Sequence, residues 1–124
     1  MPIIDVLIVR ETTAPAPTPA GLAADLAKHL GAVFEAPPGR VWVKVQVLPA
    51  AAYAENGVAI APTDLPTFVS VLHAVPPAGE VLSREALAIS QAVAGVVGCP
   101  FERVHVEYAP SGRGRVAFGG VLVQ

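Results

Sequence analysis

Residues 2–9 read P-I-I-D-V-L-I-V, and this run of apolar, mostly β-branched residues decides the fold class. A strand that is buried on both faces has this near-continuous apolar character. Residues 40–48, R-V-W-V-K-V-Q-V-L, instead alternate between valine and other side chains, which is typical of a strand with one buried face. Between the two runs, Leu22, Leu26 and Leu30 recur at helical spacing. The first half of the chain therefore predicts a strand–helix–strand unit.

Cap and breaker residues predict where this first helix begins and ends. Thr18 and Pro19 match an N-cap followed by proline at the first helical position. Gly31 is expected to cap the carboxyl end, and residues 37–39, P-P-G, break the chain before the next strand.

The same order of elements recurs about 65 residues later, after an Ala/Pro-rich linker with an Asn56-Gly57 turn. Residues 67–74 predict a strand, and residues 103–108, R-V-H-V-E-Y, predict its partner. Ser83 is expected to cap the helix between them and Gly98 to end it. The buried stripe of this helix is expected to consist of Ala86, Ile89, Val93 and Val97.

Two such units predict an α+β fold. Parallel strands joined by a helix cross over with a right hand, so two β-α-β units form a four-stranded sheet with both helices on one face. Short extra strands are expected near the C-terminus, at residues 121–123. We expect a single domain over residues 1–124, with pseudo-repeats at about residues 2–58 and 65–124. The other sheet face is then open and is expected to be apolar.

Charge is scarce in this chain. Charged residues make up 15% of it and hydrophobic residues 53%, whereas soluble domains have about 25% charged residues. A membrane span needs ~20 consecutive apolar residues, and glycines and a proline interrupt the most apolar stretch, residues 92–101. The first residues contain neither a basic region nor a cleavage site, so no signal peptide is expected. We therefore expect a cytoplasmic protein that buries apolar surface against other copies of itself.

The net charge and the numbers of cysteine and histidine residues exclude several classes of function. A net charge of −2 argues against binding to nucleic acid or to anionic membranes. The single cysteine, Cys99, excludes an intramolecular disulfide and a cysteine-rich zinc site. The three histidines are scattered, so no metal is expected, and Cys99, His29 and His73 are interpreted as structural.

Pro2 is the first candidate for chemistry. If Met1 is removed, Pro2 begins the chain with a secondary amine. An α-amino group has an ordinary pKa of ~7.7–8.0, which burial or a neighbouring cation lowers toward neutrality. A general base is most effective when its pKa lies near the working pH. We therefore expect Pro2 to be catalytic, provided that Met1 is removed.

The strand that starts at Pro2, the two β-α-β units and the G-R-V-A-F-G-G segment at residues 114–120 together resemble the tautomerase superfamily. This superfamily includes 4-oxalocrotonate tautomerase, macrophage migration inhibitory factor and malonate semialdehyde decarboxylase. The resemblance implies a homotrimer with Pro2 in a pocket at a subunit boundary. It further implies that the proline nitrogen moves a proton between carbon and oxygen of a small carboxylated enol or dienol, without a cofactor.

Candidate substrate-binding residues also follow from the resemblance. Arg10 lies close to where short family members place a substrate-binding arginine, and its alternative is a solvated loop charge. Arg113 and Arg115 are flanked by glycines that let the backbone approach a ligand, and their alternative is a hairpin packed on a neighbouring subunit. His105 and Glu107 stand where the migration-inhibitory-factor branch has a tyrosine and an asparagine, and their alternative is a surface pair.

At some positions the sequence departs from the family pattern, and these departures argue against some of the family's reactions. Gly39 stands where decarboxylase relatives have an acid, and Ala36 where migration-inhibitory-factor relatives have a lysine; Trp42 is interpreted as packing. The expected function is therefore a cofactor-independent tautomerase with Pro2 as general base. Two alternatives remain: a decarboxylase or hydratase of a small 3-oxo or unsaturated acid with protonated Pro2 as the acid, and a non-catalytic trimeric binding module.

Overall fold

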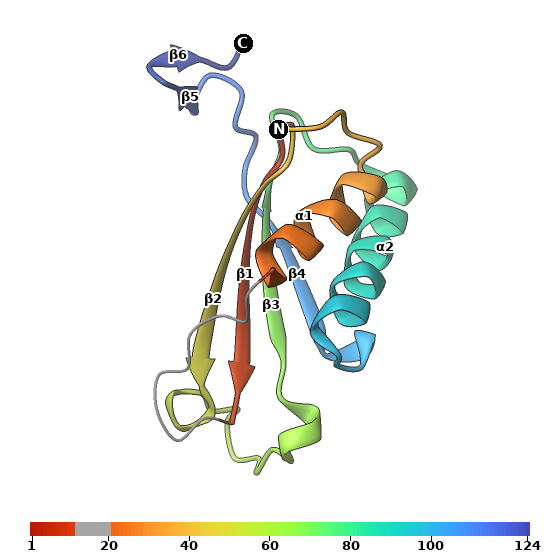
Figure 1. Cartoon of the computed structure of the whole chain (residues 1–124), viewed down its shortest axis with the longest axis vertical. Coiled ribbons are helices and arrows are strands. Elements are labelled where there is room, and N and C mark those ends of the chain that lie inside the picture. Colours follow the sequence, from red (N-terminus) through yellow and green to blue (C-terminus); the bar gives the residue numbers. More distant parts are fainter. Residues whose placement is uncertain (12–20) are drawn as a thin grey trace.

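A computed structural model of the chain describes residues 1–11 and 21–124. Two helices cover one face of a four-stranded sheet, and a small two-stranded hairpin lies beyond it (Figure 1). Thr18 and Pro19 lie outside the described residues. The helices and strands, in chain order, are β1 (Ile3–Arg10), α1 (Leu22–Val33), β2 (Trp42–Pro49), β3 (Thr67–Leu72), α2 (Gly79–Val97), β4 (Val104–Tyr108), β5 (Ala117–Phe118) and β6 (Val121–Leu122).

The strand order in the sheet is β2-β1-β3-β4. β1 pairs parallel with β2, and β3 pairs parallel with β4, so each half of the chain is a β-α-β unit. The two units meet through β1 and β3, which run antiparallel with Val6 opposite Val69. The predicted α+β fold with two helices on one face is confirmed. Because β1 and β3 are antiparallel, the start of β1 and the start of β3 lie at opposite ends of the sheet.

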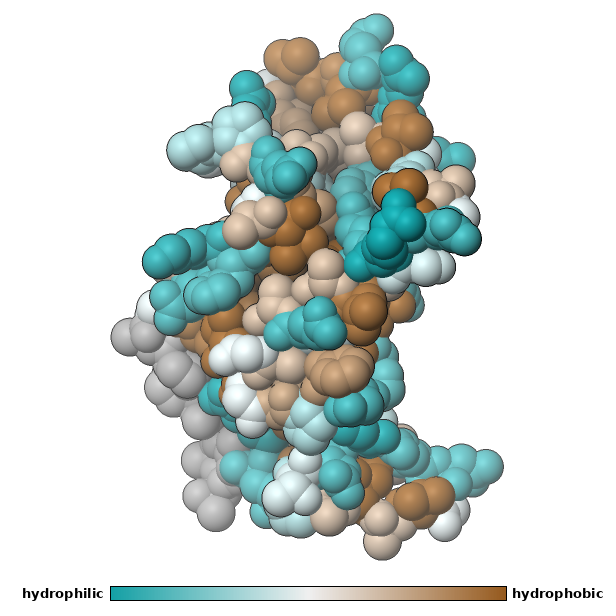
Figure 2. Space-filling view, turned by 90° about the vertical axis from the view of Figure 1, so that its right-hand side faces the viewer, coloured by the Kyte–Doolittle hydropathy of each residue, from teal (hydrophilic) through white to brown (hydrophobic). Residues whose placement is uncertain are grey.

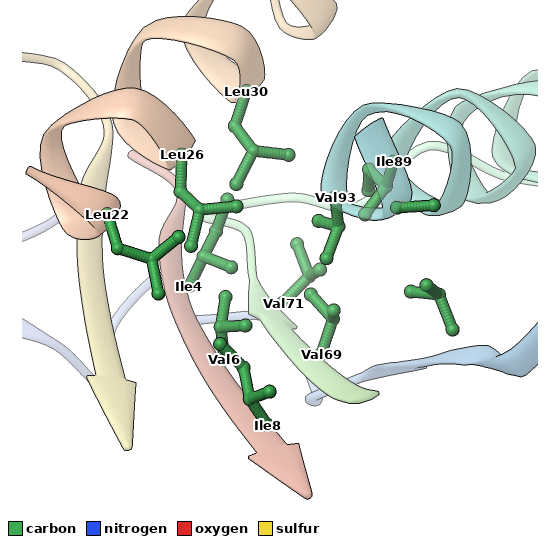
Figure 3. Packing of buried hydrophobic residues seen from close by; sticks show 12 residues of the cluster. Ile4, Val6, Ile8, Leu22, Leu26, Leu30, Val69, Val71, Ile89 and Val93 are labelled. Atoms are coloured by element: carbon green, nitrogen blue, oxygen red, sulfur yellow. The ribbon is translucent and has the colours of Figure 1, made fainter. Parts of the chain in front are cut away.

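The hydrophobic core lies between the sheet and the two helices (Figure 3). From α1, the three predicted leucines pack over Ile4, and from α2, Ile89 and Val93 pack over Val71 and Val69. All of these side chains are buried. The leucine stripe of the first helix is confirmed, and so are the two central members of the second stripe.

The expected helix ends are only partly right. Gly98 ends α2 as predicted: its φ is 84°, and its N–H donates to the Ala94 carbonyl at 2.8 Å. Ser83 is not the cap, because α2 already begins at Gly79. This glycine directly follows the extended P-P-A segment at residues 76–78. Gly31 is not a cap either, since α1 continues to Val33. Packing of the following residues, including Phe34, against the core outweighs the weak helix propensity of glycine there.

The open face of the sheet is not uniformly apolar, and this corrects the prediction. Its middle row consists of Lys44, Asp5, Ser70 and Glu107, which the strand register places side by side. Lys44 Nζ lies 3.1 Å from Asp5 Oδ1, and the Ser70 hydroxyl donates to Glu107 Oε1 at 2.7 Å. β1 is therefore buried on only one face within the chain. Apolar side chains flank the polar row: Ile3, Leu7, Trp42, Phe68 and Leu72.

The outer surface near α2 mixes polar and apolar side chains (Figure 2). Large exposed apolar residues of this region include Val75, Val81 and Leu87. Hydrophilic and hydrophobic residues are interspersed over the face that this view shows. None of the helices in the described part of the chain has the length and apolar character that crossing a bilayer requires.

Arg103 ties the linker between the two units to the sheet. Its Nε donates to the Asp64 carbonyl and its Nη2 donates to Glu55 Oε2, both at 2.6 Å. The Tyr53 hydroxyl donates to the same carboxylate oxygen at 2.7 Å. Arg103 and Glu55 are both partly buried, which protects the ion pair from full solvent screening.

We expect Arg103→Ala to lower the urea midpoint of unfolding, because it removes the ion pair with Glu55 and the hydrogen bond to the Asp64 carbonyl. Urea unfolding with Arg84→Ala as control measures this change, since Arg84 is exposed and lies 3.8 Å from Glu80. Equal unfolding midpoints for the two variants would contradict the role given to Arg103.

Candidate functional site

A cavity of about 500 Å³ opens beside the start of β1. Its walls come from five parts of the chain: the N-terminus, the end of α1, the loop before β2, the residue that follows β3, and α2. The residues that line it include Met1, Pro2, Phe34, Arg40, His73 and Glu85. The cavity therefore joins the predicted catalytic proline to His73 and Glu85 from the second β-α-β unit and to Glu35 and Arg40 from the first.

Pro2 is fixed in place at this cavity. Its side chain is fully buried, and its carbonyl accepts a hydrogen bond from the Trp42 N–H at 3.1 Å. This bond joins the starts of β1 and β2, so the ring direction is set by two paired strands. The Pro2 nitrogen is an amide while Met1 is attached, and becomes a secondary amine only when Met1 is removed.

Arg40 shapes the electrostatics at the N-terminus. Burial lowers the pKa of the Met1 amine below its ordinary value, and the positive charge of Arg40 lowers it further. Both causes disfavour the charged ammonium form. Arg40 itself is exposed at the mouth of the cavity, where its guanidinium can meet an anionic group that enters from solvent.

A partly buried polar cluster forms the opposite wall. Glu85 Oε2 accepts hydrogen bonds from His73 Nε2 at 2.9 Å and from the Tyr108 hydroxyl at 2.8 Å. The His73 and Tyr108 rings are stacked with centroids 6.0 Å apart, and Phe34 meets the His73 ring edge-on at 5.4 Å. The cluster thus holds an imidazole and a carboxylate in one arrangement beside the Pro2 cavity.

Tyr108 makes the stability of the chain sensitive to high pH. Burial raises the pKa of Tyr108 above its ordinary value, and the hydrogen bond and negative charge of Glu85 raise it further. Because the folded pKa is raised, this contribution to stability is complete below pH ~10 and is lost as the pH rises above it. Thermal melts between pH 8 and pH 11.5 should show this loss, and Tyr108→Phe should make it shallower.

Tyr53→Phe is the matched control for that measurement. The pKa of Tyr53 is also raised, first by burial and then by Glu55, but Tyr53 lies in the linker. We expect Tyr53→Phe to flatten the curve less than Tyr108→Phe. If the wild-type and Tyr108→Phe curves coincide, ionisation of Tyr108 does not contribute to the loss of stability at high pH.

The segment after β4 runs back toward the N-terminus. The Gly112 N–H donates to the His73 carbonyl at 2.8 Å, and the Arg113 N–H donates to the Ala74 carbonyl at 3.0 Å. A Cβ atom at Gly112 would lie 3.1 Å from the His73 carbonyl oxygen, a tight contact that glycine avoids. Arg113 and Arg115 are therefore exposed at the same end of the molecule as Pro2.

The hairpin of β5 and β6 is attached at this end as well (Figure 1). Trp42 stacks on Phe118 with ring centroids 4.5 Å apart and an angle of 29° between the planes. The indole thus packs within the chain, as the sequence predicted.

The remaining predicted site residues lie elsewhere in the single chain. Arg10 ends β1, eight residues along the strand from Pro2, and lines a second hollow near Gly98. His105 and Glu107 lie on the open face, where Glu107 bonds to Ser70 and His105 lies beside Phe68. Within one chain, these three do not share the Pro2 cavity, and their role as ligands of a substrate stays a prediction.

Sequence reasoning missed four residues of the site: Arg40, His73, Glu85 and Tyr108. His73 was interpreted as structural, and Arg40 only as the first residue of a strand. A signal existed for Arg40, since it directly precedes the strand that pairs with the start of β1. Glu85 offered no signal, because the polar side of a helix has many such residues.

Comparisons with models of protein families and with curated protein sequences find no match. Solved structures with the same fold are found. A fused 4-OT, a wild-type symmetric trimer, superposes with a TM-score of 0.74 at 22% identity, over 98% of this chain and 94% of that one. Macrophage migration inhibitory factor from Oncomelania hupensis gives 0.71 at 16% identity, over 100% and 83%. The chain has the tautomerase superfamily fold.

A malonate semialdehyde decarboxylase inhibited by 3-bromopropiolate shares this tautomerase fold as well. Its TM-score is 0.67 at 14% identity, over 94% of this chain and 88% of that one. All three branches of the superfamily that the sequence resembles are therefore represented among the similar structures. Identities of this size establish the shared fold, and the chemistry must be argued from the residues of the cavity.

Proposed function

We propose that the chain is a cofactor-independent keto–enol tautomerase of a small carboxylated enol or dienol, with the Pro2 amine as general base once Met1 has been removed. One observation gives the main support: a fully buried Pro2 at the start of β1 adjoins a cavity that Arg40 also lines. The fold shared with a fused 4-OT is consistent with this proposal.

In the enolisation direction, the Pro2 amine would act in its neutral form. The two causes that lower the pKa of the Met1 amine, burial and the charge of Arg40, would act on the mature amine as well. A neutral amine near pH 7 can take a proton from the carbon α or γ to a carboxylated carbonyl. The ammonium that forms then returns the proton to the other end of the enolate.

Arg40 would bind the substrate carboxylate and stabilise the negative charge that develops on the enolate. Arg113 and Arg115 lie at the same end of the molecule and could add to this positive field. Arg10 lies at the far end of β1, so it could reach a Pro2 cavity only from another copy of the chain. The same holds for His105 and Glu107, which lie on the open face and could reach a Pro2 cavity only from another copy of the chain.

We further propose a homotrimer. The fused 4-OT structures similar to this chain are trimers. Each chain has one N-terminal amine, because the position corresponding to Pro2 in the second unit, near Thr67, is inside the chain. A trimer would therefore have three proline sites.

A second function is favoured by one specific feature, the Glu85 carboxylate in the wall of the Pro2 cavity. The sequence lacks an acid at Gly39, but Glu85 supplies a carboxylate from α2 instead. A protonated Pro2 together with this carboxylate could decarboxylate a 3-oxo acid or add water to an unsaturated acid.

Three measurements separate these functions. Intact mass shows whether Met1 is absent, and retention of Met1 would leave Pro2 as an amide and favour the non-catalytic binding module. On chain that lacks Met1, ketonisation of phenylenolpyruvate tests the tautomerase, and release of carbon dioxide from malonate semialdehyde tests the decarboxylase. Activity toward only the second compound would replace the first proposal.

A further inference from the structure

The His73–Glu85–Tyr108 cluster is not needed for proton transfer by Pro2 alone, yet two of its members, His73 and Glu85, line the same cavity. The His73 and Glu85 side chains are only 12% and 15% exposed. Burying an imidazole and a carboxylate costs free energy unless they are paired and hydrogen-bonded. Their position at the substrate cavity suggests that the pair acts on what enters it.

Glu85 and Tyr108 fix the orientation of His73. An ionised carboxylate only accepts hydrogen bonds, so the Nε2 atom of His73 bears the hydrogen in its bond to Glu85, and the Tyr108 hydroxyl donates to the same oxygen. The stacked Tyr108 ring and the edge-on Phe34 ring limit rotation of the imidazole. Nδ1 is then the nitrogen that can exchange a proton with a ligand.

The reaction that we propose for Pro2 moves protons at two different atoms. One proton leaves or joins a carbon, and another joins or leaves an oxygen several bonds away. A single amine would have to exchange protons with the carbon and with the oxygen in turn. A second acid–base group on the other wall could exchange the proton of the oxygen directly.

We infer that His73, oriented by Glu85 and Tyr108, is a second catalytic acid–base residue that exchanges the oxygen-bound proton while Pro2 exchanges the carbon-bound proton; this inference rests on the proposed tautomerase function. In ketonisation, the enol O–H proton passes to Nδ1 of neutral His73 and the Pro2 ammonium gives its proton to carbon. The C=C electron pair forms the new C–H bond, and the O–H pair forms the carbonyl. The positive charge thereby moves from Pro2 to His73, and exchange with water restores both groups.

The test compares His73→Gln with His29→Gln in chain that lacks Met1. His29 is the matched control, because it lies on the exposed side of α1 and, among the described residues, bonds only to the Asp25 carbonyl. For phenylenolpyruvate, we expect His73→Gln to lower kcat about 100-fold with KM changed less than threefold. His29→Gln should keep the wild-type values. In His73→Ala, added imidazole should restore part of the lost rate.

A kcat of His73→Gln within twofold of wild type, with Pro2→Ala strongly impaired, would overturn the role of His73 and leave the proposed function intact. Full activity in Pro2→Ala would instead overturn the proposed function. Long-range ¹H–¹⁵N spectra of the wild-type protein give a readout that needs no variant. We expect Nε2-protonated His73 whose Nδ1 resonance shifts when phenylpyruvate is added, and an unshifted resonance at saturating phenylpyruvate would contradict the inference.

Glu85→Gln tests the positioning role. The amide can still meet both neighbours but lacks the negative charge, so we expect the Nε2-protonated form to lose its dominance in these spectra and kcat to fall. Retention of the wild-type spectrum would show that Glu85 does not orient His73.

Discussion

Pro2→Ala in chain that lacks Met1 is expected to lower kcat/KM for phenylenolpyruvate by about 100-fold or more. Alanine leaves a primary amine at the N-terminus, but it removes the ring that is buried at the start of β1. The direction of the nitrogen would then no longer be fixed by the backbone. A general base that is displaced from its reacting atom loses most of its effect.

The matched control for this variant is a chain with one additional residue before Pro2. It keeps the proline ring but converts its nitrogen to an amide, so it separates basicity from packing. We expect it to be inactive while its melting temperature stays close to that of the mature chain. Activity in the extended chain would exclude the amine as the base.

Arg40→Gln is expected to raise KM about tenfold or more, because the carboxylate of the substrate loses a charged donor. It should also move the limb of the pH dependence of kcat/KM that reports the Pro2 amine to higher pH. The sign follows from the charge: Arg40 lowers the pKa of the N-terminal amine, so removal of the cation lets the amine keep its proton to higher pH.

Arg84→Gln is the control for loss of one positive charge, since Arg84 lies on the exposed side of α2. It should leave KM and the pH dependence unchanged. If Arg40→Gln and Arg84→Gln behave alike, Arg40 does not bind the substrate. The arginines of the C-terminal segment, Arg113 and Arg115, would then be the next to substitute.

The sequence predicted the elements of the fold well because its signals there are local. The spacing of leucines in a helix and the alternation of valines in a strand show which side of that element faces the core. This can be read from the sequence of each element alone. The cap at Gly31 failed because packing of the following residues against the core extends α1. The cap at Ser83 failed because α2 already begins at Gly79, directly after the P-P-A segment. The open face was mispredicted because Asp5 and Ser70 come from different strands, and only the register shows that they are neighbours.

The site was less predictable for a related reason. Pro2 could be named from its position, but its cavity is made by residues from both halves of the chain. His73 and Glu85 are twelve residues apart in sequence, and Tyr108 is twenty-three residues beyond Glu85. Their meeting depends on how α2 lies across β3 and β4, which no single segment specifies.

The polar row on the open face also places opposite charges on the two edge strands of the sheet. Lys44 stands on one edge strand, β2, and Glu107 stands on the other, β4. Copies arranged head to tail in a ring would set the cation of each sheet beside the anion of the next, whereas copies arranged edge to like edge would oppose equal charges. We therefore expect the sheet to favour cyclic closure over back-to-back pairing.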